Sequence, residues 1–343
     1  MDRRRRPWFR PLARLAVSLL FLGVLLWQVE LQLVVERLQQ LSPGLVLFAC
    51  VYYALCQLLS SYRWQMFLTA KNIAVPVTSL FSYYMIGMFL NNFLPGAVGG
   101  DAAKAYYLYQ RSGQGSYALS SVLLERFSGL LGLSILSIVA LAVGPPWIHK
   151  PLVLASVGGS ALFLLMVALA LWWAPLSPRI ENALGRVLPV WIGPRLQRLY
   201  GALAGYRQHP GTVARAVALS VVIQGLYALY YGVVSWGLGL SIDVYYFLLF
   251  LPPVTLAVLA PISFAGLGIR EAMLVILFGQ VGVAAADILA VSLMAHLLTA
   301  LPSVWGGLLL LRRGREESVP VVLAADSPRS VSSVMTGTRS QRP

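Results

Sequence analysis

Residues 117–143, with the sequence YALSSVLLERFSGLLGLSILSIVALAV, decide the fold class of this chain. The stretch is apolar apart from the adjacent pair Glu125-Arg126, and it exceeds the roughly 20 residues that a helix needs to cross a bilayer. Similar runs recur along the chain, in which 58% of the 343 residues are hydrophobic and 11% are charged, against roughly 25% charged in soluble domains. The sequence therefore predicts an all-α polytopic integral membrane protein and excludes a soluble globular enzyme. Because the runs are continuously apolar rather than alternating, a transmembrane β-barrel is excluded too.

Full membrane spans are expected wherever an uninterrupted run is long enough, at residues 11–29, 43–62, 117–143, 151–174, 213–239 and 288–311. The first run follows a basic N-terminus. We expect it to remain as an anchor, because no small-residue cleavage site of a signal peptide follows it. With two interrupted apolar segments added, the chain is predicted to have about eight transmembrane segments, including one or two re-entrant or broken helical hairpins.

The basic residues are distributed unevenly between the two sides of this layout. The formal net charge is +14, from 26 Lys and Arg against 12 Asp and Glu. Most of the basic residues fall at the N-terminus, in every second connection and after the last span, and Arg63 and Lys104 are counted among them. This is the positive-inside pattern rather than a nucleic-acid-binding surface. It predicts a multi-pass protein of the plasma (inner) membrane with both termini in the cytoplasm and no nucleic-acid partner.

The same pattern divides the chain into one membrane domain and a tail. Residues 1–312 are expected to form the transmembrane domain, in which the arginine-rich residues 175–212 make a cytoplasmic amphipathic connection. Residues 313–343 are rich in Ser, Pro and Arg and lack aromatic residues, so a disordered cytoplasmic tail is predicted.

Two segments, 77–111 and 244–286, are apolar but broken by Pro and Gly. Each runs from an apolar helix through a Pro and a Gly pair to charged residues, and the charge pattern places their entrances on opposite sides of the membrane. We expect 77–111 to be a re-entrant hairpin from the cytoplasm, whereas 244–286 could be a re-entrant hairpin or two full spans. Paired breaks in opposed halves indicate an inverted repeat with a binding site near the bilayer midplane. The alternative is a pair of ordinary Pro-Gly loops at the membrane surface.

The residues at these breaks resemble the transmembrane-region family of lysylphosphatidylglycerol synthases, which carries a flippase-like domain. The resemblance rests on Asn92-Phe93-Leu94-Pro95, Gly99-Gly100-Asp101, Lys104, Tyr106, Glu125-Arg126, Pro261-Ile262-Ser263 and Gly266-Leu267-Gly268-Ile269-Arg270-Glu271, and covers roughly residues 10–312. Lys104 stands where Arg is commoner, and Phe264-Ala265 replace a more usual Pro-Gly. The resemblance implies a membrane portion associated with moving lipids between leaflets. It implies no lysyl transfer, because the soluble domain of the full-length synthases, which uses aminoacyl-tRNA, is not expected here.

The candidate substrate-binding residues lie at the two breaks and in the long charged span: Asn91, Asn92, Pro95, Gly99, Gly100, Asp101, Lys104, Glu125, Arg126, Gly266, Gly268, Arg270 and Glu271. A guanidinium binds phosphate bidentately, so Arg126 and Arg270 are the main phosphate candidates. We expect Glu125 to hold Arg126 in place. The alternative is that the charged pair locks its helix to a neighbour.

The other candidate residues could also have local structural roles. Asp101 could be a helix N-cap, and the amides after Gly99-Gly100 could bind an anion with Lys104 offsetting the carboxylate. Both glycines are expected at positions that tolerate no bulky side chain. His296, alone in the middle of a span, is expected to be a hydrogen-bonded packing residue; the alternative is a proton relay.

These features predict a lipid translocator that moves a phospholipid or a polyprenyl-phosphate-linked lipid between leaflets. No cofactor or metal is expected, and no nucleotide-binding G-x-x-x-x-G-K-[ST] motif occurs. A membrane-embedded glycosyl or headgroup transferase is the enzymatic alternative, disfavoured because the expected outer loops are short and hold few carboxylates. The third alternative is a non-transporting scaffold of envelope lipid synthesis that binds partner proteins.

Overall fold

The computed structural model describes residues 42–93, 99–173, 199, 201–259 and 268–314. All regular elements in these ranges are helices, and five of them are long and apolar enough to cross a membrane. They are α3 (Pro43–Thr69), α6 (Gly115–Val143), α7 (Pro151–Trp173), α10 (Pro210–Gly237) and α13 (Ala285–Gly314). The prediction of an all-α polytopic membrane protein is therefore confirmed. The expected first span, most of 175–212 and the tail from residue 315 lie outside the described residues.

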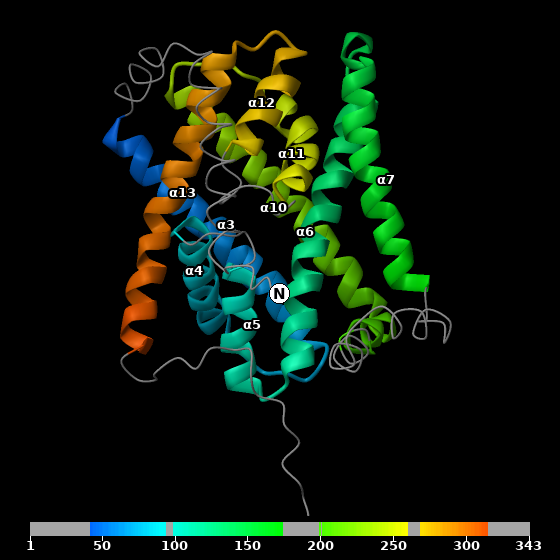
Figure 1. Cartoon of the computed structure of the whole chain (residues 1–343), viewed down its shortest axis with the longest axis vertical. Coiled ribbons are helices and arrows are strands. Elements are labelled where there is room, and N and C mark those ends of the chain that lie inside the picture. The colour runs from blue at the N-terminus through cyan, green and yellow to red at the C-terminus, as the bar shows by residue number, and fades with distance from the viewer. Residues whose placement is uncertain (1–41, 94–98, 174–198, 200, 260–267, 315–343) are drawn as a thin grey trace, which may run out of the picture.

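Local sequence explains where the long helices begin and end. The hydroxyl of Ser42 accepts a hydrogen bond from the amide of Leu45 (3.2 Å), which caps α3, and Pro43 follows at the first helical position. At the other end of the molecule, α6 stops at Gly144 before two prolines. A short 3₁₀ turn, η1 (Pro146–Ile148), then leads into α7, which returns beside α6 (Figure 1).

The two interrupted segments both form hairpins of short helices. The first consists of α4 (Val77–Phe93) and α5 (Gly99–Ser112), and the second of α11 (Val244–Leu259) and α12 (Ile269–Gly279). In each hairpin the two helices pack against each other, and the hairpins occupy opposite ends of the molecule (Figure 1). With 11 residues, α12 is about 17 Å long at 1.5 Å per residue, well short of a bilayer core of about 30 Å. The second break is thus a hairpin rather than two full spans.

The helices repeat the order span, hairpin, span. The first copy is α3, α4–α5 and α6, and the second is α10, α11–α12 and α13. The opening spans have 27 and 28 residues and the closing spans 29 and 30. The copies run in opposite directions along the molecule (Figure 1), and each hairpin packs on the closing span of the other copy: α4 on α13, and α11 on α6. This is the architecture of an inverted repeat.

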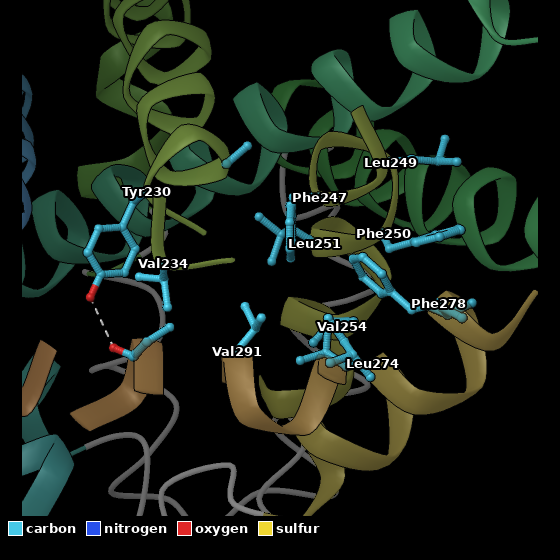
Figure 2. Close-up of a cluster of buried hydrophobic side chains, with 14 of the residues drawn as sticks. Tyr230, Val234, Phe247, Leu249, Phe250, Leu251, Val254, Leu274, Phe278 and Val291 are labelled. Carbon is cyan, nitrogen blue, oxygen red and sulfur yellow. Dashed lines mark hydrogen bonds between the residues drawn. The ribbon is translucent and has the colours of Figure 1, made fainter. Parts of the chain in front are cut away.

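Buried aromatic side chains hold the second hairpin together. Phe278 of α12 contacts two rings of α11, with centroid distances of 5.0 Å to Phe247 and 5.2 Å to Phe250 (Figure 2). The hydroxyl of Tyr230 on α10 donates to the carbonyl of Ala295 on α13 (3.1 Å), the bond drawn dashed in Figure 2. The ring contacts fix α12, which carries Arg270 near its start, against α11, and α12 also packs on α13.

Candidate functional site

A buried carboxylate joins three helices of the first copy. Glu125 of α6 accepts hydrogen bonds from Arg63 of α3 and, at 3.4 Å, from the ammonium of Lys104 on α5. All three residues are buried, with relative exposures of 3%, 4% and 7% respectively. Arg63 also donates to the hydroxyl of Ser220 on α10 (2.8 Å). The charges at this depth are therefore paired and hydrogen-bonded, as burial requires.

Asp101 extends the network to Arg126. Its two carboxylate oxygens pair with the guanidinium of Arg126 and with the ammonium of Lys104, the latter at 2.9 Å. The expectation that Glu125 holds Arg126 was therefore wrong. Neighbouring residues on a helix point about 100° apart, so Glu125 turns towards α3 and α5 while Arg126 turns towards Asp101. Asp101 is the third residue of α5 and not its N-cap.

Arg63 belongs to the buried charge network but was expected outside the membrane interior. It was counted as a cytoplasmic basic residue after a span at 43–62, but α3 continues to Thr69 and the guanidinium is buried among helices. The sequence does contain a signal for this: apolar residues flank Arg63 on both sides, so the arginine lies within an apolar run and not after its end. Lys104 was counted in the same way and is also buried, with its ammonium 4.3 Å from the centroid of the Tyr84 ring.

The second hairpin presents Arg270 differently. The carboxylate of Glu271 accepts from the backbone amide of Gly268 (2.6 Å) and from the hydroxyl of Ser292 (3.0 Å), so it closes the start of α12. One guanidinium nitrogen of Arg270 lies 2.9 Å from Nδ1 of His296 on α13. Within the described ranges, Arg270 makes no ion pair with a carboxylate. His296 is thus hydrogen-bonded, in line with the expectation, and its partner is a charged group.

The two asparagines before the first break support its backbone. The side-chain oxygen of Asn91 accepts from the amide of Gly100 (2.8 Å), and the side-chain nitrogen of Asn92 donates to the hydroxyl of Ser303 on α13 (3.1 Å). A Cβ on Gly100 would meet the carbonyl oxygen of Gly87 and lie 2.6 Å from the Asn91 amide, whereas one on Gly99 would meet nothing within 4 Å. Gly100 is therefore closed to a side chain, as expected, whereas at Gly99 there is space for a Cβ and the exclusion of a bulky side chain stays a prediction. The other predicted residues at the breaks, Pro95 and Gly266, lie outside the described residues.

A cavity of about 340 Å³ lies between the two copies. Polar groups from both copies line it, including Asn91, Asn92, Arg126, Gln224, Arg270 and His296. An apolar wall is contributed by Leu133 of α6, by Leu251, Val254 and Val258 of α11, and by Leu274 of α12. Of the predicted residues, Asn91, Asn92, Arg126 and Arg270 reach the cavity. The other described candidates do not line the cavity: Gly99, Gly100, Asp101, Lys104, Glu125, Gly268 and Glu271.

Sequence reasoning did not select Gln224 or the tyrosines that complete the polar lining, Tyr53, Tyr227, Tyr230 and Tyr231. Gln224 is the amide in the middle of an otherwise apolar span, which is a usable signal. The tyrosines give no such signal, because the same residues occur in interfacial belts. Chemically, two guanidiniums beside an apolar wall can bind an anionic group that carries an apolar chain.

The cavity and its charged surroundings lie within the part of the chain that is similar to known proteins. Residues 12–306 match the family described as lysylphosphatidylglycerol synthase TM region. The chain is similar to a UPF0104 membrane protein of Pyrococcus horikoshii, at 24% identity over 314 residues, covering 84% of this chain and 93% of that protein. It is also similar to a UPF0104 membrane protein of Methanocaldococcus jannaschii, at 27% identity over 114 residues, covering 33% of this chain and 34% of that protein.

Proposed function

Since the chain belongs to the lysylphosphatidylglycerol synthase transmembrane-region family, we propose that it is a lipid translocator that moves a phospholipid or a polyprenyl-phosphate-linked lipid between leaflets. The observation that carries the proposal is the cavity between two opposed hairpins, which Arg126 and Arg270 line beside an apolar wall. The phosphate would bind to the guanidiniums while the acyl or prenyl chains follow the apolar side.

The inverted repeat supports this proposal. Arg126 and His296 occupy the same position counted from the starts of α6 and α13, and each contacts the second helix of a hairpin, at Asp101 and at Arg270 respectively. Each copy also brings one arginine to the cavity, Arg126 on α6 and Arg270 on α12. In inverted-repeat transporters, the two copies take turns in opening a central site to either side of the membrane. A headgroup could pass from one arginine to the other during such an exchange.

The partners of the two arginines suit binding and release. Asp101 orients Arg126, whose side chain retains 32% exposure, and the imidazole of His296 orients Arg270. These contacts leave N–H donors for a ligand on both guanidiniums, because each guanidinium has five. In this proposal residues 1–312 make up the translocating domain, both termini and 175–212 face the cytoplasm, and the membrane is the plasma membrane.

Leaflet exchange in reconstituted vesicles tests the proposal. Fluorescent phosphatidylglycerol is placed in both leaflets, an impermeant reductant bleaches the outer one, and further loss of fluorescence reports exchange. Protein-containing vesicles should lose nearly all fluorescence, whereas protein-free vesicles should keep about half, because one of the two leaflets is protected. The same fluorescence from both kinds of vesicle, with this tracer and with a polyprenyl phosphate tracer, would refute translocation.

The Arg126→Lys and Arg270→Lys variants test the site. Lysine keeps the charge but loses the planar fork. Exchange should slow about tenfold or more, since a hydrogen bond to a charged group contributes about 1.5–3 kcal/mol and 1.4 kcal/mol is a factor of ten. Arg215→Lys, at an exposed position near the start of α10, is the matched control and should exchange lipid at the unmodified rate. Unimpaired exchange in both cavity variants would leave the two arginines with a structural role alone, through Asp101 and His296 respectively.

A further inference from the structure

The charges in the interior of the described structure do not balance. Seven charged residues lie inside the spans or near the tips of the two hairpins. They are the cations Arg63, Lys104, Arg126 and Arg270, and the anions Asp101, Glu125 and Glu271. The count leaves one positive charge over. The hairpin tips that the structure does not describe, residues 94–98 and 260–267, contain no ionisable residue and so add no charge to this count.

The contacts show which of these charged groups face the cavity. Arg63, Lys104 and Glu125 lie behind the cavity, and Asp101 reaches Arg126 from the same side. Glu271 uses both carboxylate oxygens on the amide of Gly268 and the hydroxyl of Ser292, and it makes no ion pair with Arg270 within the described ranges. The guanidiniums of Arg126 and Arg270 are therefore the two charges that face the cavity.

His296 adds a neutral donor to these two cations. An arginine has no acceptor, so Nδ1 of His296 must accept the hydrogen bond from Arg270 (2.9 Å). The imidazole is then neutral, and its remaining N–H, at Nε2, can donate a hydrogen bond. The cavity wall offers an anion two guanidiniums, one imidazole N–H and the amide of Gln224. With the charged residues behind the wall included, the net charge of the seven interior residues is +1.

We propose that the cavity selects a phosphodiester headgroup with a single net negative charge over a phosphomonoester, a zwitterion or a cationic headgroup. The inference rests on the proposed lipid translocation and names its substrate class. An uncompensated charge in the membrane interior is costly. A monoanion brings the buried group to neutrality, whereas a dianion leaves one negative charge, a zwitterion leaves one positive charge, and a cation leaves two.

Binding and exchange are measured separately, so that this inference and the proposed function can fail independently. The ligands are dihexanoyl forms of phosphatidylglycerol, phosphatidate, phosphatidylcholine and its cationic phosphate ethyl ester, and the readout is calorimetry with the full chain in a neutral detergent. Phosphatidylglycerol should bind the most tightly, by about tenfold, the order expected for one unmatched charge in a partly buried site. Phosphatidate or phosphatidylcholine binding as tightly as phosphatidylglycerol would overturn the inference. Binding of phosphatidylglycerol without exchange in vesicles would instead refute translocation.

Two variants that change the net charge at the cavity test whether this charge sets the headgroup preference. Arg270→Gln removes one positive charge without leaving a carboxylate unpaired, so the preference should move by about tenfold from phosphatidylglycerol towards phosphatidylcholine. Asp101→Asn adds one net positive charge, so the preference should move by a similar factor towards phosphatidate. Arg215→Gln makes the same change in protein charge outside the cavity and should keep the original order of affinities. An unchanged order in folded Arg270→Gln would overturn the inference, even if Asp101→Asn failed to fold.

Discussion

Arg63 of α3 and Glu125 of α6 form a buried ion pair that connects residues 62 positions apart in the chain. The pair fastens the opening span of the first copy to its closing span, and Lys104 adds the second helix of the hairpin to the same carboxylate. Arg126, the sequence neighbour of Glu125, is left to face the cavity. One helix thus carries a structural charge and a ligand-facing charge side by side.

Replacing Glu125 should destabilise the protein strongly. Glu125→Gln leaves Arg63 and Lys104 without their shared carboxylate, and breaking a buried pair costs about 3–5 kcal/mol. Thermal unfolding in detergent should show a clearly lower Tm. Asp243→Asn, which neutralises an exposed carboxylate at the start of α11, should change the stability by less than about 0.5 kcal/mol. Equal Tm values for the two variants would contradict the structural role of Glu125.

The two glycines of the first break should respond differently to alanine. A Cβ at Gly100 meets the backbone of Gly87 and the Asn91 side chain, so Gly100→Ala should cost about 1–3 kcal/mol or open the hairpin. Gly99→Ala has free space within a helix and should be neutral or stabilising by up to about 1 kcal/mol. Unfolding curves of the two single variants decide the point. The prediction fails if Gly99→Ala is the more damaging change.

Gly268 should resist substitution for a reason of backbone geometry. Its φ is +85°, in the region that L residues rarely adopt, and its amide donates to Glu271. Gly268→Ala should therefore cost about 1–2 kcal/mol. Gly279→Ala, at the other end of α12, has an ordinary φ and nothing within 4 Å of the added Cβ. A comparison of their Tm values checks the prediction, and similar stability of both variants would argue against strain at Gly268.

The orientation of the protein can be read from single cysteines. In a background with Cys50→Ser and Cys56→Ser, a cysteine at the exposed Gln208 should react with an impermeant maleimide only after the membrane is opened, because the basic connection is expected inside. A cysteine at the exposed His149, next to the turn between α6 and α7, should react in intact cells. The reverse labelling pattern would show that the membrane topology is opposite to the one predicted from the basic residues.

Much of the architecture could be predicted from sequence because it depends on local quantities. A helix must be long and apolar to cross a bilayer, so composition and run length place α3, α6, α7, α10 and α13 to within a few residues at most ends. Pro and Gly interrupt helices wherever they occur, so both breaks were visible. The cost of burying a charge drew attention to Arg126, and the charged helix start after the second break drew attention to Arg270; both reach the cavity.

What the sequence by itself determined is therefore an all-helical membrane protein with two opposed breaks and a small set of buried charges. Only the tertiary structure decided which charge meets which: Glu125 with Arg63 and Lys104, Arg126 with Asp101, and Arg270 with His296. It also decided that Gly100 is closed and Gly99 open. The physical reason is that an ion pair or a close approach depends on the rotation of one helix against another distant in sequence, and run length and composition carry no information about that rotation.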